Sequence, residues 1–465
     1  MATFPVKWFS SEMQGSPQLS STYEATGGSW NSSAPYESNY VKGQVVSMLK
    51  AFLIDGFGDT TPTSITYDAA SDRVTVEFGV VHYFKKHSVI KIEGADQAPY
   101  NGEFRVTKTF ATSFEYKPDS APGSATATTS TALNCLVPPC DGWEIIDDDS
   151  TNFRMVIGRT AADASPFKMI IRNDQNYQWV DFTNTSWVNQ GIVGCRIEVV
   201  DNFVDYENYD FIDRYYVPAS ASHYQYTSSN PDSTSYWDQK KPFYFYADTH
   251  CFYWLANVGY TGERAAFFFG DIISARPGDR GHFMGIGYQA YSSPNFDTTS
   301  WSGGPNFIHK DNSAQYTGLP TEVSQRGYPT FATDYANNVG ATKAIVKTPF
   351  TSTFYEGQLL QYPNPANSGL YLSQEKSVVL EWPVNDVASI STIENKIILR
   401  GFLPGYLSCM QNPLNLDGKF LEGMPGFADA IVAANYTFGR SGNISTIVYG
   451  DYMHFTRLDQ WRDNP

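Results

Sequence analysis

Two runs of acidic residues are the part of this sequence whose side chains could do chemistry. The first run is Asp147, Asp148 and Asp149, and the second, interleaved with aromatic residues, is Asp201, Asp205, Glu207, Asp210 and Asp213. A glycosidase needs two carboxylates that face each other across a sugar. A calcium loop needs oxygen ligands spaced as in DxDxDG, and neither run has that spacing. Three interpretations stay open: solvated acidic loops, which we favour, a cation site, and a catalytic pair.

Other catalytic motifs are absent from the sequence. The seven histidines contain no HExxH pair. The segment GRSGN (residues 439–443) is one residue short of a nucleophile elbow. GHFMGIG (residues 281–287) has spaced glycines but opens no expected helix, so it does not read as a phosphate loop. We therefore predict no catalytic, no cofactor-binding and no metal-binding residues, no cofactor, and a chain that is not an enzyme.

The cysteines are too few and too scattered for a disulfide scaffold. There are five of them: Cys135, Cys140, Cys195, Cys251 and Cys409. The spacing of Cys135 and Cys140 around LVPP allows a bridge, and whether it forms stays open at this point. No second Cys or His pair stands at zinc spacing. Buried free thiols are the favoured interpretation.

Charge and composition narrow the range of partners. The formal net charge is −16 and the isoelectric point is near 4.8, which argues against binding to nucleic acid or to anionic membranes. No signal peptide and no run of eighteen apolar residues is visible, so we expect no membrane insertion and a chain made in the cytosol. Aromatic residues make up 15% and charged residues 17%, a balance typical of folded, β-rich proteins with adaptable contact surfaces.

The clearest structural pattern lies in residues 64–132, which contain five short extended runs. Val74, Val76 and Phe78 alternate with Thr75 and Glu77. Alternation with period two, broken by turn residues, is typical of a half-buried antiparallel sheet. These residues therefore predict a small antiparallel β-barrel or sandwich module.

An amphipathic helix is expected before this module. Its apolar residues fall at helical spacing, Ser38 or Asn39 can cap its start, and Gly56 can end it. The apolar stripe is Val41, Val45, Met48, Leu49, Phe52 and Leu53. We expect this stripe to pack on the rest of the chain.

The whole chain is predicted to be mainly β, with an N-terminal arm, one helix, the small module and a large β-rich body with long loops. The expected divisions are an extended arm at 1–37, the helix at 38–60, the module at 61–132, a linker at 133–141, and the body at 142–465, split into two subdomains near 290–350. Long polar stretches at 217–241 and 291–342 are expected to reach neighbouring subunits.

The arm carries aromatic residues without periodicity, so it cannot form its own core. It is expected to pack its aromatics either on its own body or on a neighbouring subunit. On the second alternative the predicted assembly contacts are Trp8, Phe9, Trp30 and, from the helix, Phe52.

Several segments together resemble virion structural proteins of tailed bacteriophages. The more specific ones are VKWFSSEMQGSPQLS (residues 6–20) and VIKIEGADQAPYNGEFRV (residues 89–106). The others are LIDGFGD (53–59), GWE (142–144), FFFGDIISARPGD (267–279), RGFLPGYL (400–407) and MPGF (424–427). The resemblance covers most of the chain in patches and departs from the expected pattern at 217–241 and after residue 291.

The resemblance implies a virion component that is assembled in the host bacterial cytoplasm, with no catalytic or metal-binding residues. The leading expectation is a subunit of the tail, baseplate or neck that anchors through its arm and helix. Its partners would be other virion proteins and copies of itself in a symmetric assembly. The alternatives are a capsid decoration protein and a receptor- or glycan-binding protein, with or without hydrolase activity, whose partner would be a host surface glycan.

Overall fold

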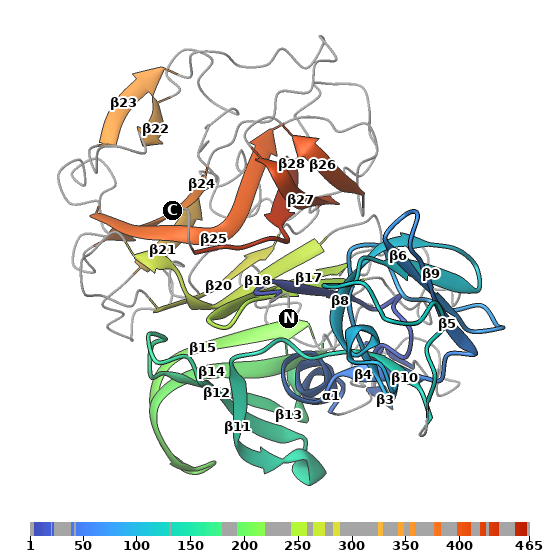
Figure 1. The fold of residues 1–465 in the computed structure, drawn as a ribbon. Helices are drawn as coiled ribbons and strands as arrows, with labels where there is room; N and C mark the ends of the chain where they lie inside the picture. The colour runs from blue at the N-terminus through green and yellow to red at the C-terminus, as the bar shows by residue number, and fades with distance from the viewer. Residues whose placement is uncertain are drawn as a thin grey trace, which may run out of the picture.

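The computed structural model describes residues 4–19, 21–22, 39–40, 43–129, 132–178, 193–218, 243–257, 264–274, 282–288, 324–328, 343–347, 354–358, 376–382, 398–410, 419–424, 427–436 and 452–462. These residues form antiparallel sheets and one α-helix, which confirms the prediction of a mainly β fold. Figure 1 shows the small module at the right, one sheet at the bottom, and further sheets above it.

The helix α1 (Gln44–Lys50) continues directly into a π-helical turn, η1 (Ala51–Asp55). Its buried residues confirm the predicted stripe from Val45 to Leu53. The helix begins after Gly43, not at Ser38 or Asn39, because Asn173 on a distant strand caps it: the side-chain oxygen of Asn173 accepts a hydrogen bond from the Val45 N–H at 3.1 Å. Gly56 ends the helix with a φ of 77°, as predicted.

Asn39 instead belongs to β3 (Asn39–Tyr40), which pairs with β2 (Ser21–Thr22). Figure 1 places α1 between the small module and the sheet at the bottom of the view. The helix therefore packs between the module and this sheet, as expected from its apolar stripe.

The module is a sheet of seven strands whose order begins at β4 and ends at β5. Its central strand, β8, pairs with β7 through its first half and with β9 through its second half, with an irregularity between Val106 and Lys108. The strands at the two ends of this order do not pair with each other, so the module has the sandwich form and is not a closed barrel. Its strands, in sheet order, are β4 (Phe57–Thr60), β10 (Asn134–Val137), β7 (Val89–Glu93), β8 (Gly102–Thr109), β9 (Ser113–Tyr116), β6 (Arg73–Glu77) and β5 (Ser64–Asp68).

A central sheet of five strands includes the first strand of the chain. β1 (Lys7–Ser10) pairs with β16 along its whole length, from Lys7 opposite Ala247 to Ser10 opposite Tyr244. The rest of this sheet is β16 (Phe243–Ala247), β17 (Cys251–Asn257), β18 (Arg264–Asp271) and β20 (His282–Tyr288). The N-terminal arm thus contributes an edge strand to a sheet of the body.

A second sheet of five strands lies at the bottom of Figure 1, and its strands follow the order of the sequence. They are β11 (Trp143–Asp149), β12 (Arg154–Arg159), β13 (Lys168–Gln178), β14 (Val193–Asp205) and β15 (Asn208–Pro218). One face packs on the main core through Met155, Ile157, Met169 and Ile171. The other face carries Val156, Ile170 and Val200, which the tip of the β14–β15 hairpin covers with Tyr206.

The C-terminal part of the described chain forms a further sheet. Its strands are β21 (Ser324–Tyr328), β24 (Lys376–Trp382), β25 (Ile398–Met410), β28 (Tyr452–Arg457), β27 (Phe427–Tyr436) and β26 (Phe420–Met424), with β19 (Ile273–Ser274) paired to β25. A separate pair is formed by β22 (Lys343–Lys347) and β23 (Phe354–Gln358). The stretches 217–241 and 291–342 lie largely outside the described residues.

One cluster of buried side chains connects these units. The Phe9 and Phe52 rings stack at a centroid distance of 4.8 Å and an interplanar angle of 4°. Phe52 also contacts Phe245 of β16 at 5.3 Å and Phe57 of β4 at 5.3 Å. The same cluster extends to Trp461 near the end of the chain. The N-terminal strand, helix, module and body therefore share one core.

The position of Phe52 at this junction leads to a stability prediction. Replacing Phe52 by Ala leaves a cavity among rings that are packed on all sides, and we expect it to lower the free energy of unfolding by about 3–5 kcal/mol. The matched control is Phe110→Ala, because Phe110 is 45% exposed and its loss is expected to cost less than about 1 kcal/mol. Urea unfolding of both variants measures the difference. Equal losses would contradict the placement of Phe52 in the shared core.

Candidate functional site

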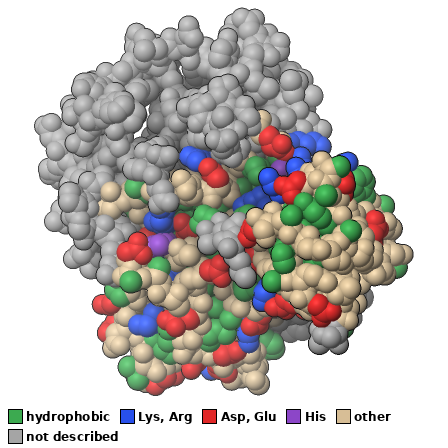
Figure 2. All heavy atoms as spheres, in the orientation of Figure 1, with side chains coloured by type: hydrophobic (Ala, Val, Ile, Leu, Met, Phe, Trp, Pro, Cys, Tyr) green, Lys and Arg blue, Asp and Glu red, His purple; other side chains and the backbone are tan. Residues whose placement is uncertain are grey.

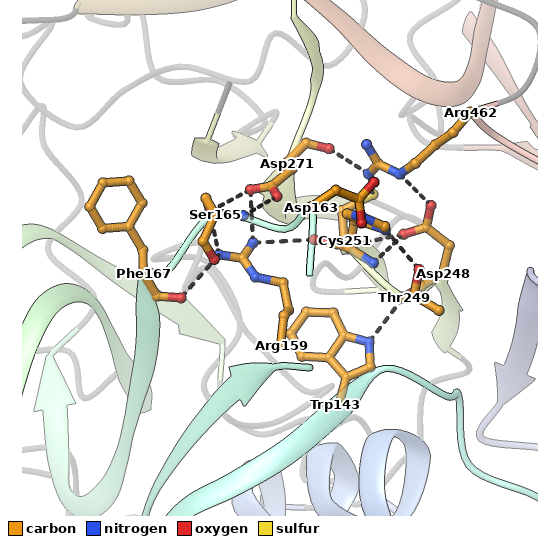
Figure 3. A network of polar contacts seen from close by, with 11 residues as sticks. Trp143, Arg159, Asp163, Ser165, Phe167, Asp248, Thr249, Cys251, Asp271 and Arg462 are labelled. Carbon is orange, nitrogen blue, oxygen red and sulfur yellow. Dashed lines mark hydrogen bonds and ion pairs between the residues drawn. The ribbon is translucent and has the colours of Figure 1, made fainter. Parts of the chain in front are cut away.

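A buried network of charged residues joins three segments of the body (Figure 3). At its centre the guanidinium of Arg159, with 0% side-chain exposure, pairs with the Asp271 carboxylate at 3.1 Å. Arg159 also donates to the Ser165 hydroxyl at 2.6 Å and to the Phe167 carbonyl at 3.0 Å. Asp271 in turn accepts from the Ser165 N–H at 2.7 Å. These contacts fix the loop after β12 against the end of β18.

The same network holds Arg462, which lies near the C-terminus. Its Nε donates to the Asp248 carboxylate at 2.9 Å, and its other nitrogen donates to the Asp271 carbonyl at 2.6 Å. Asp248 also accepts the N–H groups of His250 and Cys251, at 2.8 and 2.7 Å, and so shapes the turn between β16 and β17. Arg462 therefore attaches the last described segment to the central sheet by an ion pair.

A hydroxyl, an imidazole and a carboxylate stand in a row at the edge of this network. The Thr249 hydroxyl lies 2.7 Å from Nδ1 of His250, and Nε2 of His250 lies 2.9 Å from the Asp163 carboxylate. This order resembles a nucleophile, base and acid. The Asp163 side chain is 82% exposed, however, so water screens its charge and it orients the imidazole only weakly. Thr249 also packs closely on Gly142: a Cβ atom placed on Gly142 would lie only 2.6 Å from the Cβ of Thr249.

The electrostatics of the network favour a structural role. Burial raises the pKa of the Cys251 thiol well above its usual value, so the group is a neutral thiol and not a nucleophilic thiolate. Burial alone would lower the pKa of Arg462, but the charge and hydrogen bond of Asp248 together with the charge of Asp271 and the Cys251 sulfur outweigh it, and the pKa is raised. The hydrogen bond from His250 lowers the pKa of Asp163. Each buried charge thus has an opposite charge beside it, as desolvation requires.

A second set of charged contacts attaches the module to the body. Lys7, 1% exposed, donates to Glu103 of β8 at 2.8 Å and to the Pro139 carbonyl at 2.8 Å, and it pairs with Asp141 at 3.3 Å. Arg105, also on β8, donates to the Leu458 carbonyl at 2.9 Å. One strand of the module is therefore connected to both ends of the chain.

His87 forms the third contact between the module and the body. Its Nε2 lies 2.8 Å from the Glu422 carboxylate of β26, and its ring meets Phe420 edge-on at 4.9 Å. Lys86 pairs with the same carboxylate at 2.6 Å, and the backbone carbonyl of His87 accepts from Arg105 at 2.8 Å. Burial, followed by the positive charge of Lys86, lowers the pKa of His87 to about 4 in spite of Glu422.

The two acidic runs both lie on the five-stranded sheet β11–β15, and basic side chains neutralise several of their members. Asp148 pairs with Lys50 of the helix at 2.6 Å, and Asp149 pairs with Arg154. Asp205 accepts the N–H groups of Glu207 and Asn208 and so caps the turn of the hairpin. Asp147 lies on β11, Asp201 and Asp210 are exposed on the hairpin, and the side chain of Asp213 lies outside the described residues.

Glu198 is a buried acid that the sequence reasoning missed. It has no exposed surface, lies 3.1 Å from Arg196 and 3.6 Å from Arg172, and accepts a hydrogen bond from Tyr209 at 2.9 Å. The signal was present in the sequence: Arg196 and Glu198 occupy alternate positions of an apolar strand, so both point to one face. Among the described residues, no group of three or more metal-ligating side chains converges.

Three of the four residues predicted as assembly contacts are buried within the chain itself. Trp8, Phe9 and Phe52 are 3%, 1% and 0% exposed, respectively, inside the core of this chain, and Trp30 lies outside the described residues. The described part of the arm, residues 4–19, therefore packs on the chain's own body, the first of the two alternatives. In this conformation these three side chains offer no surface to a neighbour, because the central sheet, the helix and β26 already cover them.

The cysteines agree with the prediction of free thiols. Cys135, Cys140, Cys195 and Cys251 are buried and unbridged, which resolves the question left open for Cys135 and Cys140. The side chain of Cys409 lies outside the described residues. Among the described residues, the structure has no helix that is both long and apolar enough to span a membrane.

Comparison with known proteins gives little further guidance. No family model and no curated protein matches the chain. Among solved structures, one match is the phage phi92 endosialidase, with a TM-score of 0.15 and 10% sequence identity. The alignment covers 88% of this chain and 52% of that one, so this chain spans about half the length of the protein it matches. A similarity this low supports no conclusion about fold or function.

The buried network yields a prediction with an internal control. Replacing Asp271 by Ala leaves Arg159 buried without its carboxylate, and we expect a loss of about 3–5 kcal/mol in the free energy of unfolding. Asp163→Ala removes an exposed acid from the same network and is expected to cost less than about 1 kcal/mol. Chemical denaturation of the two variants tests this. A loss for Asp271→Ala no larger than that of the control would show that Arg159 does not depend on the pair.

The contact at His87 predicts an effect of pH on stability. The unfolded chain protonates this histidine near pH 6.5, whereas the folded chain does so only near pH 4. The stability contributed by His87 is therefore complete above about pH 6.5 and is lost as the pH falls toward about 4. Burial also lowers the pKa of His82, which adds a loss of the same sign.

The measurement is the free energy of unfolding in urea between about pH 7 and about pH 4.5. His87→Gln keeps a hydrogen-bond donor for Glu422 but does not titrate, so its stability is expected to fall less steeply than that of the wild type. His82→Gln serves as the comparison for the second histidine. Identical slopes for the wild type and His87→Gln would contradict the assignment.

Proposed function

We propose that this chain is a structural subunit of a tailed-bacteriophage virion, placed in the tail, baseplate or neck, that holds neighbouring subunits without catalysing a reaction. The proposal starts from the sequence segments that resemble such proteins, above all residues 6–20 and 89–106. In the fold these segments contribute β1, β7 and β8, and the contact between Lys7 of β1 and Glu103 of β8 joins the body to the module.

One observation carries the proposal: the buried charged groups of the described chain are used to connect its own elements. Arg159, Arg462 and Lys7 each bridge segments far apart in the sequence. Such networks give a rigid subunit in which the charges are matched, instead of a pair of carboxylates poised to act on a substrate. Two of the acids that suggested a glycosidase, Asp148 and Asp149, are paired with Lys50 and Arg154, which favours the interpretation without a catalytic pair.

The sequence suggested that the arm and helix anchor the subunit to its neighbours, and the fold changes this expectation. Because β1 and the helix are buried in the core, the proposed subunit contacts its neighbours through surfaces other than the arm and helix. The described surface offers exposed apolar side chains at Val80, Val81 and Tyr83 of the module. Exposed apolar groups of this kind are typical of contact surfaces.

The direct test is to locate the protein in particles of the phage that encodes it. We expect mass spectrometry to find the chain in purified virions and gold-labelled antibody to mark the tail, baseplate or neck. Label over the capsid would instead support a decoration protein. Absence from purified particles would overturn the proposal.

The remaining alternative needs an assay of its own. Binding to a glycan array, or release of dye from labelled host envelope, would indicate a receptor-binding protein with or without hydrolase activity. The matched variant is His250→Ala, which breaks the row formed by Thr249, His250 and Asp163. We expect no hydrolysis by the wild type; hydrolysis that is lost in His250→Ala would overturn the non-enzymatic role.

A further inference from the structure

The loop between β6 and β7, together with Phe110 from the turn between β8 and β9, carries an exposed apolar patch formed by Val80, Val81, Tyr83 and Phe110. Their exposures are 64%, 59%, 58% and 45%, respectively. The neighbouring residues of the same loop point inward: Phe78, His82 and Phe84 pack with Phe114. The patch is therefore the outer side of a packed loop.

Hydrogen bonds hold this patch in place. The N–H of His82 donates to the Ala111 carbonyl at 3.1 Å, and the N–H of Phe78 donates to the Thr112 carbonyl at 2.9 Å. The His82 ring contacts the Ser113 carbonyl at 2.8 Å. The loop that carries the valines is thus tied to the turn that carries Phe110, and ordering this surface on binding has little entropic cost.

Three lysines lie beside the patch, and two of them are paired with acids. The ammonium of Lys108 lies over the Phe110 ring, 4.5 Å from its centroid. Lys85 and Lys86 follow Tyr83 in the sequence, and they pair with Glu12 at 3.2 Å and Glu422 at 2.6 Å. Glu12 offsets the charge of Lys85, and Glu422 offsets that of Lys86. Lys108 is therefore the positive group that the patch presents beside its apolar side chains.

Another exposed apolar residue, Val204, is surrounded by acidic side chains. Val204, 68% exposed, is at the tip of the β14–β15 hairpin. The residues around it are acidic and exposed: Asp201, Asp205, Glu207 and Asp210. Tyr206, between two of these acids, folds back over the sheet and stacks on Arg154, so Val204 and the acids are left facing outward.

This tip is also rigid. Asp205 accepts hydrogen bonds from the N–H groups of Glu207 and Asn208 at 2.8 and 2.9 Å, which locks the turn. Arg172 donates to the Tyr206 carbonyl and fixes the turn to the sheet. In Figure 2 acidic side chains gather over the lower part of the molecule, where the five-stranded sheet lies, whereas the module is at the right.

We propose that the acidic hairpin tip around Val204 binds the basic-edged apolar patch around Val81 on a second copy of this chain. The two surfaces are complementary in charge and both are apolar at their centres. They belong to different units of one molecule, which Figure 1 shows apart from each other, so a single chain does not bring them together. Each copy then offers one tip and one patch, and the contact is head-to-tail.

A head-to-tail contact has a geometric consequence: repeated copies close into a ring or continue as a filament. This contact rests on the assembly role proposed above and specifies the two surfaces and the type of symmetry that the assembly would use. It is tested on the purified full chain alone. Failure of the contact and absence from virions are therefore separate outcomes.

The experiment compares the oligomeric state of three proteins by sedimentation velocity over a range of concentrations. The wild type is expected to form oligomers, whereas Val81→Asp and Val204→Lys are each expected to stay monomeric, with association weakened at least about tenfold. Both positions are exposed, so melting temperatures close to that of the wild type are expected and confirm folding. Ile146→Asp, at an exposed apolar residue outside both surfaces, is the control and is expected to oligomerise normally.

Mixing the two monomeric variants tests the head-to-tail arrangement directly. Val81→Asp retains its tip and Val204→Lys retains its patch, so the mixture is expected to form dimers and nothing larger. A contact between two identical surfaces would not be restored in this way. A wild type that stays monomeric at all concentrations, or a mixture without dimers, overturns the proposal.

A charge exchange gives an independent readout. Lys108→Glu and Glu207→Lys are each expected to weaken association, and the double variant is expected to recover it because the pair is restored with its polarity reversed. Added salt is expected to weaken the wild-type oligomer. Additive losses in the double variant would refute the pairing of these two surfaces.

Discussion

Lys7–Ser10 lie beside Phe243–Ala247 at the edge of the central sheet, and the connections among the other units depend on this pairing. Once β1 is in place, Phe9 stacks on Phe52 of the helix segment, and Lys7 reaches Glu103 of the module. The C-terminal residues contact the same region through Leu458, whose carbonyl accepts from Arg105. The start of the chain therefore occupies the position where the helix, module, body and C-terminal residues meet.

The cost of burying charge explains how these units are attached to one another. Lys7 and Arg159 have almost no exposed surface, and a buried cation without a partner would be strongly destabilising. Each partner belongs to another segment: Glu103 lies on the module, and Asp271 is at the end of β18. The ion pairs do not need to add much net stability to be decisive. They disfavour any arrangement of the segments that would separate the charges, and so they specify one relative placement.

The sequence predicted those parts of the fold that depend on local pattern. The alternation of Val74 and Val76 placed a strand of the module, and the helical spacing from Val45 to Leu53 placed the helix. The strand β1 was not predicted because it is four residues long, contains a lysine, and pairs with residues far along the chain. Its aromatic residues suggested a surface, since nothing local shows that Phe245 and Phe52 will cover Phe9.

The ion pairs also could not be predicted, because their partners lie on other elements or far away in the sequence. The acidic runs were visible in the sequence, but their partners Lys50 and Arg154 were not, because Lys50 lies on a different element and the turn between Asp149 and Arg154 had to form first. Arg159 and Asp271 are 112 residues apart and could be joined only by the fold. Without knowledge of their partners, acids in a sequence suggest a catalytic or metal-binding role. In the fold, Asp148, Asp149 and Asp271 form ion pairs that connect elements of the chain.

The distribution of the apolar residues completes this picture. In the body, strands such as β16 and β17 bury nearly every side chain, and the polar turn at Asp248 is satisfied from within. The module instead leaves valine and tyrosine exposed on a loop whose other face is packed and hydrogen-bonded. A loop of this kind gains nothing for its own fold from exposed Val80 and Val81, since Phe78 and Phe84 already supply its core. Apolar surface held in water lowers its free energy only when something covers it, which is why this loop of the module is the part of the described chain best suited to a neighbour.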